Sequence, residues 1–351
     1  MSKKIFVTGG TGFIGSHTIL SLLQRGYDVI AYDSLRNSSF KSLERVKEIL
    51  KNDNPNEEIK LEFIKGDIRD RNLIQNIFEE SEKIGKEISA VIHFAGLKSV
   101  AKSIINPIDY WDVNVSGTIN LLRIMQSFNC CKLVFSSSAT VYGLSNGETL
   151  KEEFKIDPIS PYGFTKAVNE NFLQNLYHGP LQEWSICNLR YFNPIGAHES
   201  GKIGENPIGI PNNIFPLINQ VGLNIEKNIK VFGNDWNTND GTCVRDYIDV
   251  MDLSEGHILA LESVIQKNKS FLNLNLGTGK GISVLNLINA FEEANNIKIP
   301  YVFSERREGD RPFLVADNSK AKRILNWSPK RNLIDTCRNG WKWFKNNPKG
   351  Y

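Results

Sequence analysis

Metal-binding spacings, charge blocks and repeats are all missing from this sequence. The five cysteines contain no C-x-x-C pair and the five histidines show no metal-ligand spacing, so we expect no bound metal. The 42 basic residues nearly balance the 39 acidic residues and form no block of like charge. This balance argues against a nucleic-acid-binding protein or a membrane-surface protein. We also find no internal repeat and no low-complexity tract.

Long hydrophobic runs are missing at the amino terminus as well. Two lysines are followed by only Ile5-Phe6-Val7 before the first glycines, which is too short for a signal peptide or a membrane span. An odd number of scattered cysteines predicts reduced, mostly buried thiols. We therefore expect a cytoplasmic protein, and its 351 residues allow a large core and two lobes. The cysteines are Cys130, Cys131, Cys187, Cys243 and Cys337.

A glycine-rich turn is present between two predicted strands. Lys4 to Thr8 reads as a short apolar strand, and Gly9-Gly10-Thr11-Gly12-Phe13-Ile14-Gly15 follows it. A helical pattern then stops at Gly26, and a second strand from Asp28 to Tyr32 ends in Asp33. This order predicts a dinucleotide site, because glycines let a pyrophosphate approach the helix amino terminus while the acid accepts from the ribose hydroxyls. The alternative is an ordinary strand–helix turn of an α/β protein.

Asp33 indicates which dinucleotide we expect. Its carboxylate would repel a phosphate on the ribose, which favours NAD over the phosphorylated cofactor. Arg36 lies nearby in the sequence and is the one feature that opposes this interpretation.

The same alternation of strands and helices continues through the first half of the chain. We expect strands at Glu62–Lys65, Ala90–Phe94 and Lys132–Phe135 and a long amphipathic helix from Asp109 to Phe128 that carries Asn114. This order predicts a Rossmann-type, doubly wound parallel sheet with ligands at the carboxyl ends of its strands.

Polar or small residues follow three of these predicted strands. Asp67 either reaches the adenine of a dinucleotide or caps the next helix, and Ala95-Gly96 would let a flat ring lie close. Ser138 ends the strand that begins at Lys132, so its hydroxyl would point into the cleft. Because three serines stand in a row, an ordinary turn explains them equally well.

Tyr162 and Lys166 form the most distinctive pair in the sequence. Ser160-Pro161 favours the start of a helix, which would place these two side chains one turn apart on the same face. Ionising a phenol at pH 7 costs roughly 4 kcal/mol, and a cation about 4 Å away offsets a similar amount. Tyr162 is the one tyrosine of ten with a lysine four residues later, which makes it a candidate general base. Chance alone predicts about one such pair in a chain of this composition, so a coincidental pair is the alternative.

The amino-acid composition changes after residue 189, where proline and asparagine become more frequent. We predict an NAD-binding domain over 1–190 and a smaller α/β substrate lobe over 191–351, with the chain re-entering the first domain within about 241–268. The segment Arg306 to Arg311 is dense in charge and by itself reads as a solvated loop.

Several motifs together resemble the UDP-glucose 4-epimerases, in the extended short-chain dehydrogenase/reductase family. The resemblance runs from residue 3 to about the end of the chain. The motifs are Gly9–Thr18, Ser136–Gly143, Leu189–Pro194, Gly209-Ile210-Pro211-Asn212-Asn213, Asp240–Thr242, Val244–Tyr247 and Arg306-Arg307-Glu308-Gly309-Asp310.

The resemblance implies a role for each catalytic candidate. Tyr162 as phenolate would take the proton from the sugar 4-hydroxyl while hydride passes to a tightly held NAD, and hydride would return to the other face of a 4-keto sugar. Ser138 would hydrogen-bond the 4-oxygen, and Lys166 would hold the nicotinamide ribose and keep the pKa of Tyr162 low.

The resemblance also implies two sets of ligand-binding residues. The NAD site would comprise Gly9, Gly12, Phe13, Ile14, Gly15, Asp33, Asn37, Ser38, Asp67, Ile68, Phe94, Ala95, Gly96, Lys98, Asn114, Tyr162, Lys166 and Phe192. The UDP-sugar site would comprise Ser138, Tyr162, Asn193, Asn213, Ile214, Phe232, Arg245, Tyr247, Arg307, Asp310 and Leu314, with Arg245 and Arg307 on the diphosphate.

Three further expectations come from the same family. Related 4,6-dehydratases need acids just after the strand-end hydroxyl, and this chain has Ala139 and Thr140 there, which favours an epimerase. Leu314 stands where the family sets the pocket size beside the second sugar carbon, so we predict glucose/galactose activity and leave N-acetyl sugars open. We expect a homodimer formed through the 109–128 helix and the helix that carries Tyr162.

Overall fold

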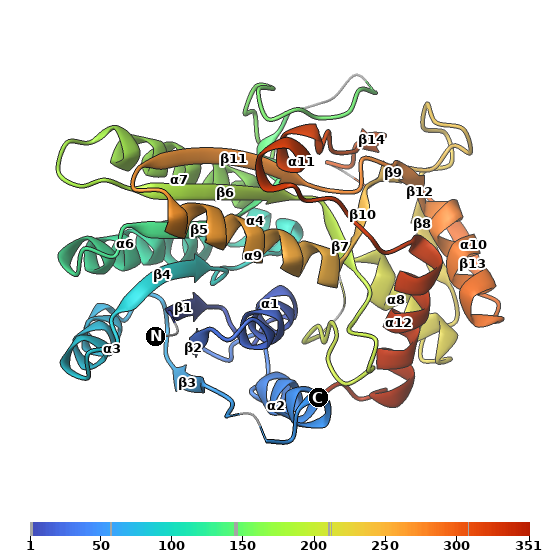
Figure 1. Cartoon of the computed structure of the whole chain (residues 1–351). Helices are drawn as coiled ribbons and strands as arrows, with labels where there is room; N and C mark the ends of the chain where they lie inside the picture. The colour runs from blue at the N-terminus through green and yellow to red at the C-terminus, as the bar shows by residue number, and fades with distance from the viewer. Residues whose placement is uncertain (1–2, 57, 144–146, 210, 212, 308) are drawn as a thin grey trace.

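The computed structural model describes residues 3–351 except 57, 144–146, 210, 212 and 308. Three residues of the motifs quoted above, Ile210, Asn212 and Glu308, therefore lie outside the described part of the chain. Two regions are visible in Figure 1: a large sheet flanked by helices, and a smaller group of short strands and helices at one end of it.

Seven parallel strands form the central sheet, in the order β11-β6-β5-β4-β1-β2-β3. The order reverses direction between β1 and β4, as in a doubly wound Rossmann sheet, and this confirms the predicted fold class. The strands are β1 (Lys4–Thr8), β2 (Asp28–Asp33), β3 (Leu61–Lys65), β4 (Ile88–His93), β5 (Lys132–Ser138), β6 (Ser185–Tyr191) and β11 (Ser270–Leu276).

Helices cover both faces of this sheet. Alternate residues of β1 face opposite sides, so Ile5 and Val7 join one apolar core and Phe6 joins the other. The first core is closed by α1 (Phe13–Gln24), α2 (Lys41–Asp53), α9 (Val250–Gln266) and α11 (Ser319–Leu325). The second is closed by α3 (Arg71–Lys83), α6 (Gly117–Ser127) and α7 (Pro161–His178).

The smaller region has its own apolar core, in which Phe215 and Phe291 meet edge to face. The chain leaves the large sheet after β6, builds part of this region, and returns through α9 to β11, which pairs with β6. The returning helix α9 lies at Val250–Gln266, inside the predicted 241–268 interval, and β11 follows it. Its elements are β7 (Asn193–Ile195), α8 (Ile214–Gly222), β8 (Ile229–Phe232), β9 (Val244–Arg245), β10 (Tyr247–Asp249), β12 (Ile282–Ser283), α10 (Val284–Asn295), β13 (Tyr301–Ser304), β14 (Phe313–Leu314) and α12 (Leu333–Asn346).

The prediction of one continuous helix from Asp109 to Phe128 is wrong. The structure has two short helices, α4 (Val100–Ile105) and α5 (Pro107–Trp111), then a π-helical turn over Asp112–Ser116 before α6. The π-turn contains Asn114, and such turns are rare and frequent at functional sites. Apolar periodicity cannot distinguish one widened turn from a continuous α-helix.

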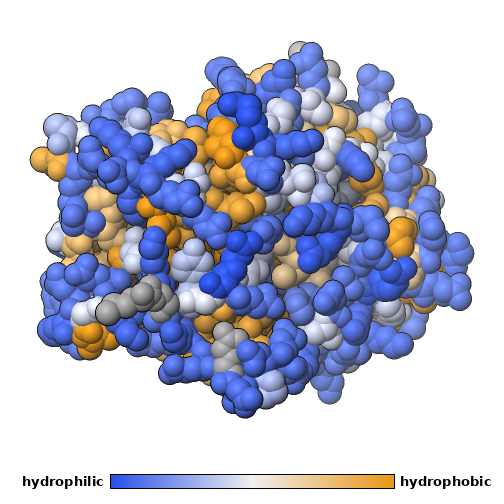
Figure 2. Space-filling view, viewed as in Figure 1, coloured by the Kyte–Doolittle hydropathy of each residue, from blue (hydrophilic) through white to orange (hydrophobic). Residues whose placement is uncertain are grey.

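The surface and the cysteines agree with the sequence-based picture. Figure 2 shows a mostly hydrophilic face on which apolar residues gather in separate small areas. All five cysteines are free and buried, as predicted. Among the described helices, none combines the length and the apolar character needed to cross a membrane.

Candidate active site

The glycine turn is packed so tightly that side chains would not fit. Gly9 has a positive φ of 71°, and a Cβ placed there would lie 2.7 Å from the amide nitrogen of Ala95. A Cβ on Gly15 would lie 2.2 Å from the carbonyl oxygen of Gly9. The helix α1 begins at Phe13 directly after this turn, with Gly12 at its N-cap and no side chain capping its amides. Its amino terminus therefore offers open backbone donors to a pyrophosphate.

Asp33 ties this turn to the loop that follows β2. Its carboxylate is 7 % exposed and accepts hydrogen bonds from the Thr11 amide at 3.1 Å and the Ser38 hydroxyl at 2.8 Å. Asn37, beside Ser38, is exposed on the same loop. The guanidinium of Arg36 forms an exposed ion pair with Asp109 at 3.5 Å. Arg36 is thus already paired with a carboxylate, which favours the NAD interpretation.

Asp67 does not cap α3, so one of the two sequence-based alternatives is wrong. The cap is Asp70, which accepts from the amide of Leu73 at 3.0 Å. Asp67 instead accepts from the guanidinium and the backbone amide of Arg69, and these hydrogen bonds lower the pKa of its carboxyl. Its neighbour Ile68 is buried.

The loop after β4 is held by Asn114. The side-chain oxygen of Asn114 accepts from the amide of Leu97 at 2.7 Å, and its NH₂ group donates to the Leu97 carbonyl and the Thr165 hydroxyl. A Cβ on Gly96 would lie 3.1 Å from the same oxygen. Asn114 therefore fixes the small-residue loop Phe94–Gly96 against α7, and its polar atoms are used by protein partners.

The three predicted catalytic residues converge at the carboxyl end of β5. Ser138 is the last residue of that strand, and its oxygen accepts hydrogen bonds from the amide and hydroxyl of Thr140 at 3.2 and 3.0 Å. Ser160 caps α7 and Pro161 begins it, which places Tyr162 and Lys166 one turn apart, both buried. The Lys166 ammonium donates to the Ser136 carbonyl at 2.6 Å and lies 6.0 Å from the centre of the Tyr162 ring.

Burial dominates the ionisation of this pair. It raises the pKa of Tyr162 to about 12, although a hydrogen bond with Ser138 acts in the opposite direction. Burial also lowers the pKa of Lys166 to about 8, against the charge of Glu170. Forming the phenolate at pH 7 therefore costs about 7 kcal/mol rather than the 4 kcal/mol expected from an exposed phenol. With Lys166 nearby, the pKa of Tyr162 is still raised, so one lysine does not offset burial to the extent that the sequence suggested.

The arginines predicted to bind a diphosphate share one carboxylate. Asp310 accepts from Arg245 at 3.4 Å and from Arg307 at 3.0 Å, and the Arg307 guanidinium lies 5.6 Å from the centre of the Phe232 ring. Burial and the charge of Arg245 lower the pKa of Arg311 beside them. The group therefore carries excess positive charge, as a diphosphate site requires.

Arg306 lies apart from this group, in agreement with its predicted solvated position. It pairs with Asp235 at 2.8 Å and stacks on Trp236 at 4.0 Å.

Leu314 brings the smaller region against the end of β5. It pairs in register with Arg245 across β14 and β9, and it packs on the cluster that contains Ala139 and Phe192. Nearby, Tyr247 on β10 pairs with Asn193 on β7, so the strand pair carries two more predicted substrate ligands.

Glu205 is a residue that sequence reasoning missed. It is 4 % exposed, and its Oε1 accepts from Lys98 at 3.2 Å and from Asn213 at 3.3 Å, beside Ile214 at the start of α8. Its Oε2 is buried and has no hydrogen-bond partner among the residues that the structure describes. One carboxylate thus joins a predicted cofactor ligand to a predicted substrate ligand. No local pattern signals it, because Lys98 lies 107 residues away.

Comparison with known proteins places this geometry in a family. The model of the family described as GDP-mannose 4,6 dehydratase matches residues 6–339. UDP-glucose 4-epimerase 2 of Arabidopsis thaliana is 47 % identical over 351 residues, covering all of this chain and 97 % of the relative. The UDP-glucose 4-epimerase of Bacillus subtilis is 47 % identical and covers 99 % of this chain and 98 % of its own length.

A solved structure agrees with these sequence matches. The UDP-glucose-4-epimerase from Stenotrophomonas maltophila, with bound NAD and formylated UDP-arabinopyranose, superimposes with a TM-score of 0.93. It is 42 % identical and the match covers 99 % of both chains. The chain therefore belongs to the UDP-glucose 4-epimerases, within the extended short-chain dehydrogenase/reductase family.

Proposed function

We propose that this protein interconverts UDP-galactose and UDP-glucose with NAD as its cofactor. The observation that carries the proposal is the meeting of two regions at the end of β5. Ser138, Tyr162 and Lys166 lie at that strand end, and Leu314 packs on Ala139 beside them. The register of β14 and β9 then places Arg245 next to Leu314, so a sugar site and a diphosphate site adjoin.

The first region fits NAD. The cradle around Gly9 and Gly15 has no room for a Cβ, α1 presents uncapped amides, and Asp33 stands at the end of β2. We assign the pyrophosphate to this turn, the adenosine ribose to Asp33, Asn37 and Ser38, and the nicotinamide side to the Phe94–Gly96 loop and Lys166. When bound, NAD supplies oxidation and re-reduction at the sugar 4-position.

Tyr162 acts as the base in this proposal. Its phenolate takes the 4-hydroxyl proton and later returns it, and Ser138 donates to the 4-oxygen. The cost of ionisation, about 7 kcal/mol, exceeds the roughly 4 kcal/mol that one nearby cation offsets, so we assign this role to two positive charges: the Lys166 ammonium and the bound cofactor. Tyr162 is then a base only when the cofactor is in place, which restricts the chemistry to the loaded site.

The second region holds the nucleotide. Arg245 and Arg307 bind the diphosphate. Phe232 presents a partly exposed ring to the uracil ring of the nucleotide. The other parts of the UDP-sugar contact Asn193, Asn213 and Tyr247. Asp310 orients both guanidinium groups before the ligand arrives. Leu314 leaves more space beside the sugar than a large aromatic would, so we propose glucose/galactose turnover with slower turnover of N-acetyl sugars.

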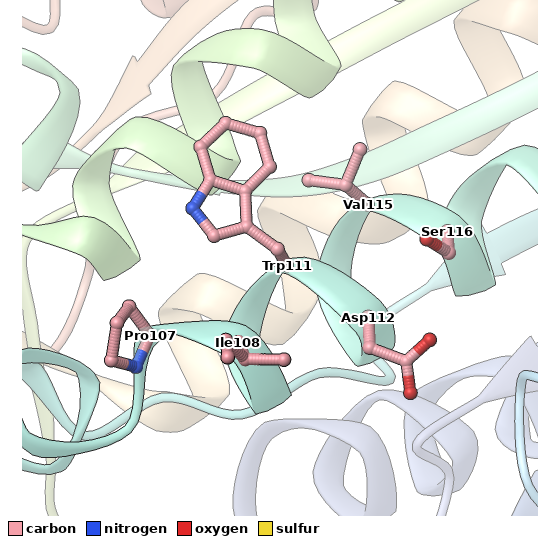
Figure 3. Close-up of a pocket in the computed structure, with 6 residues that line it drawn as sticks. All are labelled: Pro107, Ile108, Trp111, Asp112, Val115 and Ser116. Atoms are coloured by element: carbon pink, nitrogen blue, oxygen red, sulfur yellow. The ribbon is translucent and has the colours of Figure 1, made fainter.

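We also propose that the protein is a homodimer. The exposed faces of α4, α5 and α7 carry large apolar side chains: Ile104, Ile105, Ile108, Trp111, Phe164 and Val168. Figure 3 shows Ile108, Trp111 and Val115 along α5 and the π-turn, where they line a shallow pocket with Pro107, Asp112 and Ser116. An apolar face of this extent on adjacent helices is typical of a subunit interface. Ile108→Glu should convert the dimer to a monomer in sedimentation velocity; an unchanged dimer would place the interface elsewhere.

Two organisational assignments complete the proposal. We keep 1–190 with α9, β11 and α11 as the NAD-binding domain and assign the rest of 191–351 to the UDP-sugar domain. We further infer a cytoplasmic protein, supported by five buried thiols without disulfides, as is usual in reducing compartments.

Incubation of the purified protein with UDP-galactose alone tests the function. We expect UDP-glucose to form without added NAD or any external oxidant, because an epimerase returns the hydride that it removes. A requirement for stoichiometric oxidant, with a keto sugar as product, would indicate a dehydrogenase instead.

A further inference from the structure

A buried ion pair lies one helical turn beyond the catalytic lysine. Glu170 on α7 and Arg190 on β6 have side chains that are 5 % and 2 % exposed. The guanidinium contacts the carboxylate three times, at 2.6 Å from NH2 to Oε2 and at 2.9 and 3.2 Å from Nε to the two oxygens. Neither residue was singled out by the sequence.

The pair is connected to both strands that carry the site. Ser137, next to Ser138 on β5, donates its hydroxyl to Glu170 at 2.5 Å. Arg190 precedes Tyr191, whose hydroxyl is hydrogen-bonded to that of Ser136. The backbone carbonyl of the same residue, Ser136, accepts a hydrogen bond from the Lys166 ammonium. Glu170 and Arg190 thus contact the framework that positions Ser138 and Lys166.

The guanidinium of Arg190 is held from a second direction as well. Its NH1 donates to the hydroxyl of Tyr142 and to the carbonyl of Glu152, each at 3.0 Å. Tyr142 in turn donates to Asn275 on β11 at 2.6 Å. The position of Glu170 is therefore fixed by three strands of the sheet.

Stability alone does not account for such a pair. Replacing a buried ion pair with apolar residues of similar volume is often neutral or stabilising, because desolvation offsets the attraction between the charges. The charge of Glu170 has a second effect: the buried Lys166 ammonium, one helical turn away, is the cation that this charge favours.

We propose that Glu170, oriented by Arg190, is a positioning residue of the epimerase site that stabilises the Lys166 ammonium and fixes the strand end carrying Ser138. The inference rests on the proposed function, because it assigns Lys166 the role of a permanent cation beside the base.

The other ionisable groups around Lys166 do not supply this charge. On α7 itself Tyr162 is a neutral phenol, with its pKa raised to about 12. On β4, burial lowers the pKa of His93 to about 3, so His93 is uncharged. Burial raises the pKa of Tyr191 on β6 and of Tyr110 on α5, so both are neutral. Among the described residues, Glu170 is the carboxylate whose charge favours the Lys166 ammonium.

The direction of the pH effect follows from the sign of the Lys166 shift. Burial has already lowered the pKa of Lys166 to about 8, so its charge is present at neutral pH and is lost as the pH rises through that value. Neutralising Glu170 lowers this pKa further. The active form, in which Lys166 is charged and Tyr162 is ionised, is then lost at a lower pH than in the wild-type protein.

The test is the pH dependence of kcat for Glu170→Gln, with Ser137→Ala as the matched control that keeps the carboxylate charge. We expect the alkaline limb of the Glu170→Gln profile to move down by about one pH unit, with KM for UDP-galactose nearly unchanged. The alkaline limb of Ser137→Ala should stay in place. A Glu170→Gln profile that matches the wild-type protein would overturn the proposal.

A neutral pair keeps the test decisive if Glu170→Gln alone does not fold. The double variant Glu170→Gln, Arg190→Met removes both charges, so no unpaired buried charge remains. A folded double variant with the alkaline limb still displaced supports an electrostatic role. Restoration of the wild-type limb would overturn the proposal, because removal of the whole ion pair would then leave the charge of Lys166 unchanged.

A titration without turnover separates this inference from the proposed function. Tyrosinate absorbance of the NAD-loaded protein, compared with its Tyr162→Phe variant, reports the pKa of Tyr162 directly. We expect that pKa to rise in the double variant, because the neighbouring lysine loses its charge. If the wild-type protein does not turn over UDP-galactose, the proposed function fails, whereas an unchanged Tyr162 pKa refutes only the role of Glu170.

Discussion

The two sides of the site are built differently. On the proposed NAD side, backbone groups and short buried side chains dominate: neither Gly9 nor Gly15 has room for a Cβ, and Asp33 is 7 % exposed. On the proposed UDP side, the ligand contacts come from long side chains, and Arg245 and Leu314 lie on strands of only two residues. The Arg307 side chain, in a loop, is 56 % exposed. From this difference we expect a rigid cofactor site, formed by the large sheet and its glycine turn, and a substrate site that orders further when its ligand binds.

The glycine turn should show the largest effect. Gly15→Ala places a Cβ 2.2 Å from the Gly9 carbonyl, so the turn has to move. We expect the purified variant to lack NAD and to lose more than about 99 % of turnover. Gly26→Ala is the control: its positive φ costs about 1 kcal/mol, but no heavy atom lies within 4 Å of the new methyl group. The NAD content of both purified variants is the measurement. A Gly15→Ala protein that retains full cofactor would contradict the view that the glycine turn is a rigid part of the NAD site.

Removing a guanidinium on the UDP side should weaken substrate binding and leave NAD in place. Arg245→Met loses charge-assisted contacts worth about 2–3 kcal/mol, so we expect KM for UDP-galactose to rise roughly 30- to 160-fold. Arg306→Met is the matched control, because Arg306 pairs with Asp235 instead. Steady-state kinetics of both variants make the comparison. Equal effects of the two changes would mean that the diphosphate lies elsewhere.

Leu314 should tune substrate choice in both directions. Leu314→Ala enlarges the space next to Ala139, so the ratio of N-acetylhexosamine turnover to hexose turnover should rise about tenfold. Leu314→Tyr should lower the same ratio. Competition assays with UDP-galactose and UDP-N-acetylgalactosamine measure it, and a ratio that stays constant in both variants would place the pocket wall at another residue.

A single hydroxyl on the NAD side should have the smallest effect. Ser38→Ala removes one donor to Asp33, and a net hydrogen bond of about 1 kcal/mol corresponds to roughly fivefold weaker NAD binding. Titration of NAD into the cofactor-stripped protein tests this expectation. A loss much greater than fivefold would show that the NAD side is less rigid than its buried contacts indicate.

Local sequence patterns predicted the parts of the structure that depend on local chemistry. The glycine turn, the strand ending at Ser138 and the helix carrying Tyr162 and Lys166 all follow from apolar runs, turn residues and a proline at a helix start. These features lie within a few residues of their causes. They sufficed for the fold class and for the position of the catalytic pair.

The features that sequence reasoning missed depend on the detailed path of the backbone or on contacts between distant segments. The π-turn around Asn114 is not visible in apolar periodicity, and the choice between Asp67 and Asp70 as helix cap depended on the path of the backbone. The carboxylate of Glu205 meets Lys98 only after folding. Burial likewise decided the ionisation of Tyr162, because desolvation outweighs the neighbouring lysine.

Comparison of the Tyr162→Phe variant with the wild-type protein shows whether Tyr162 is the base of the reaction. The two proteins should retain equal NAD and bind UDP equally well, while conversion of UDP-galactose alone to UDP-glucose should fall by about a thousandfold in the variant. Retained conversion with bound NAD would contradict the account, because the base would then be a residue other than Tyr162.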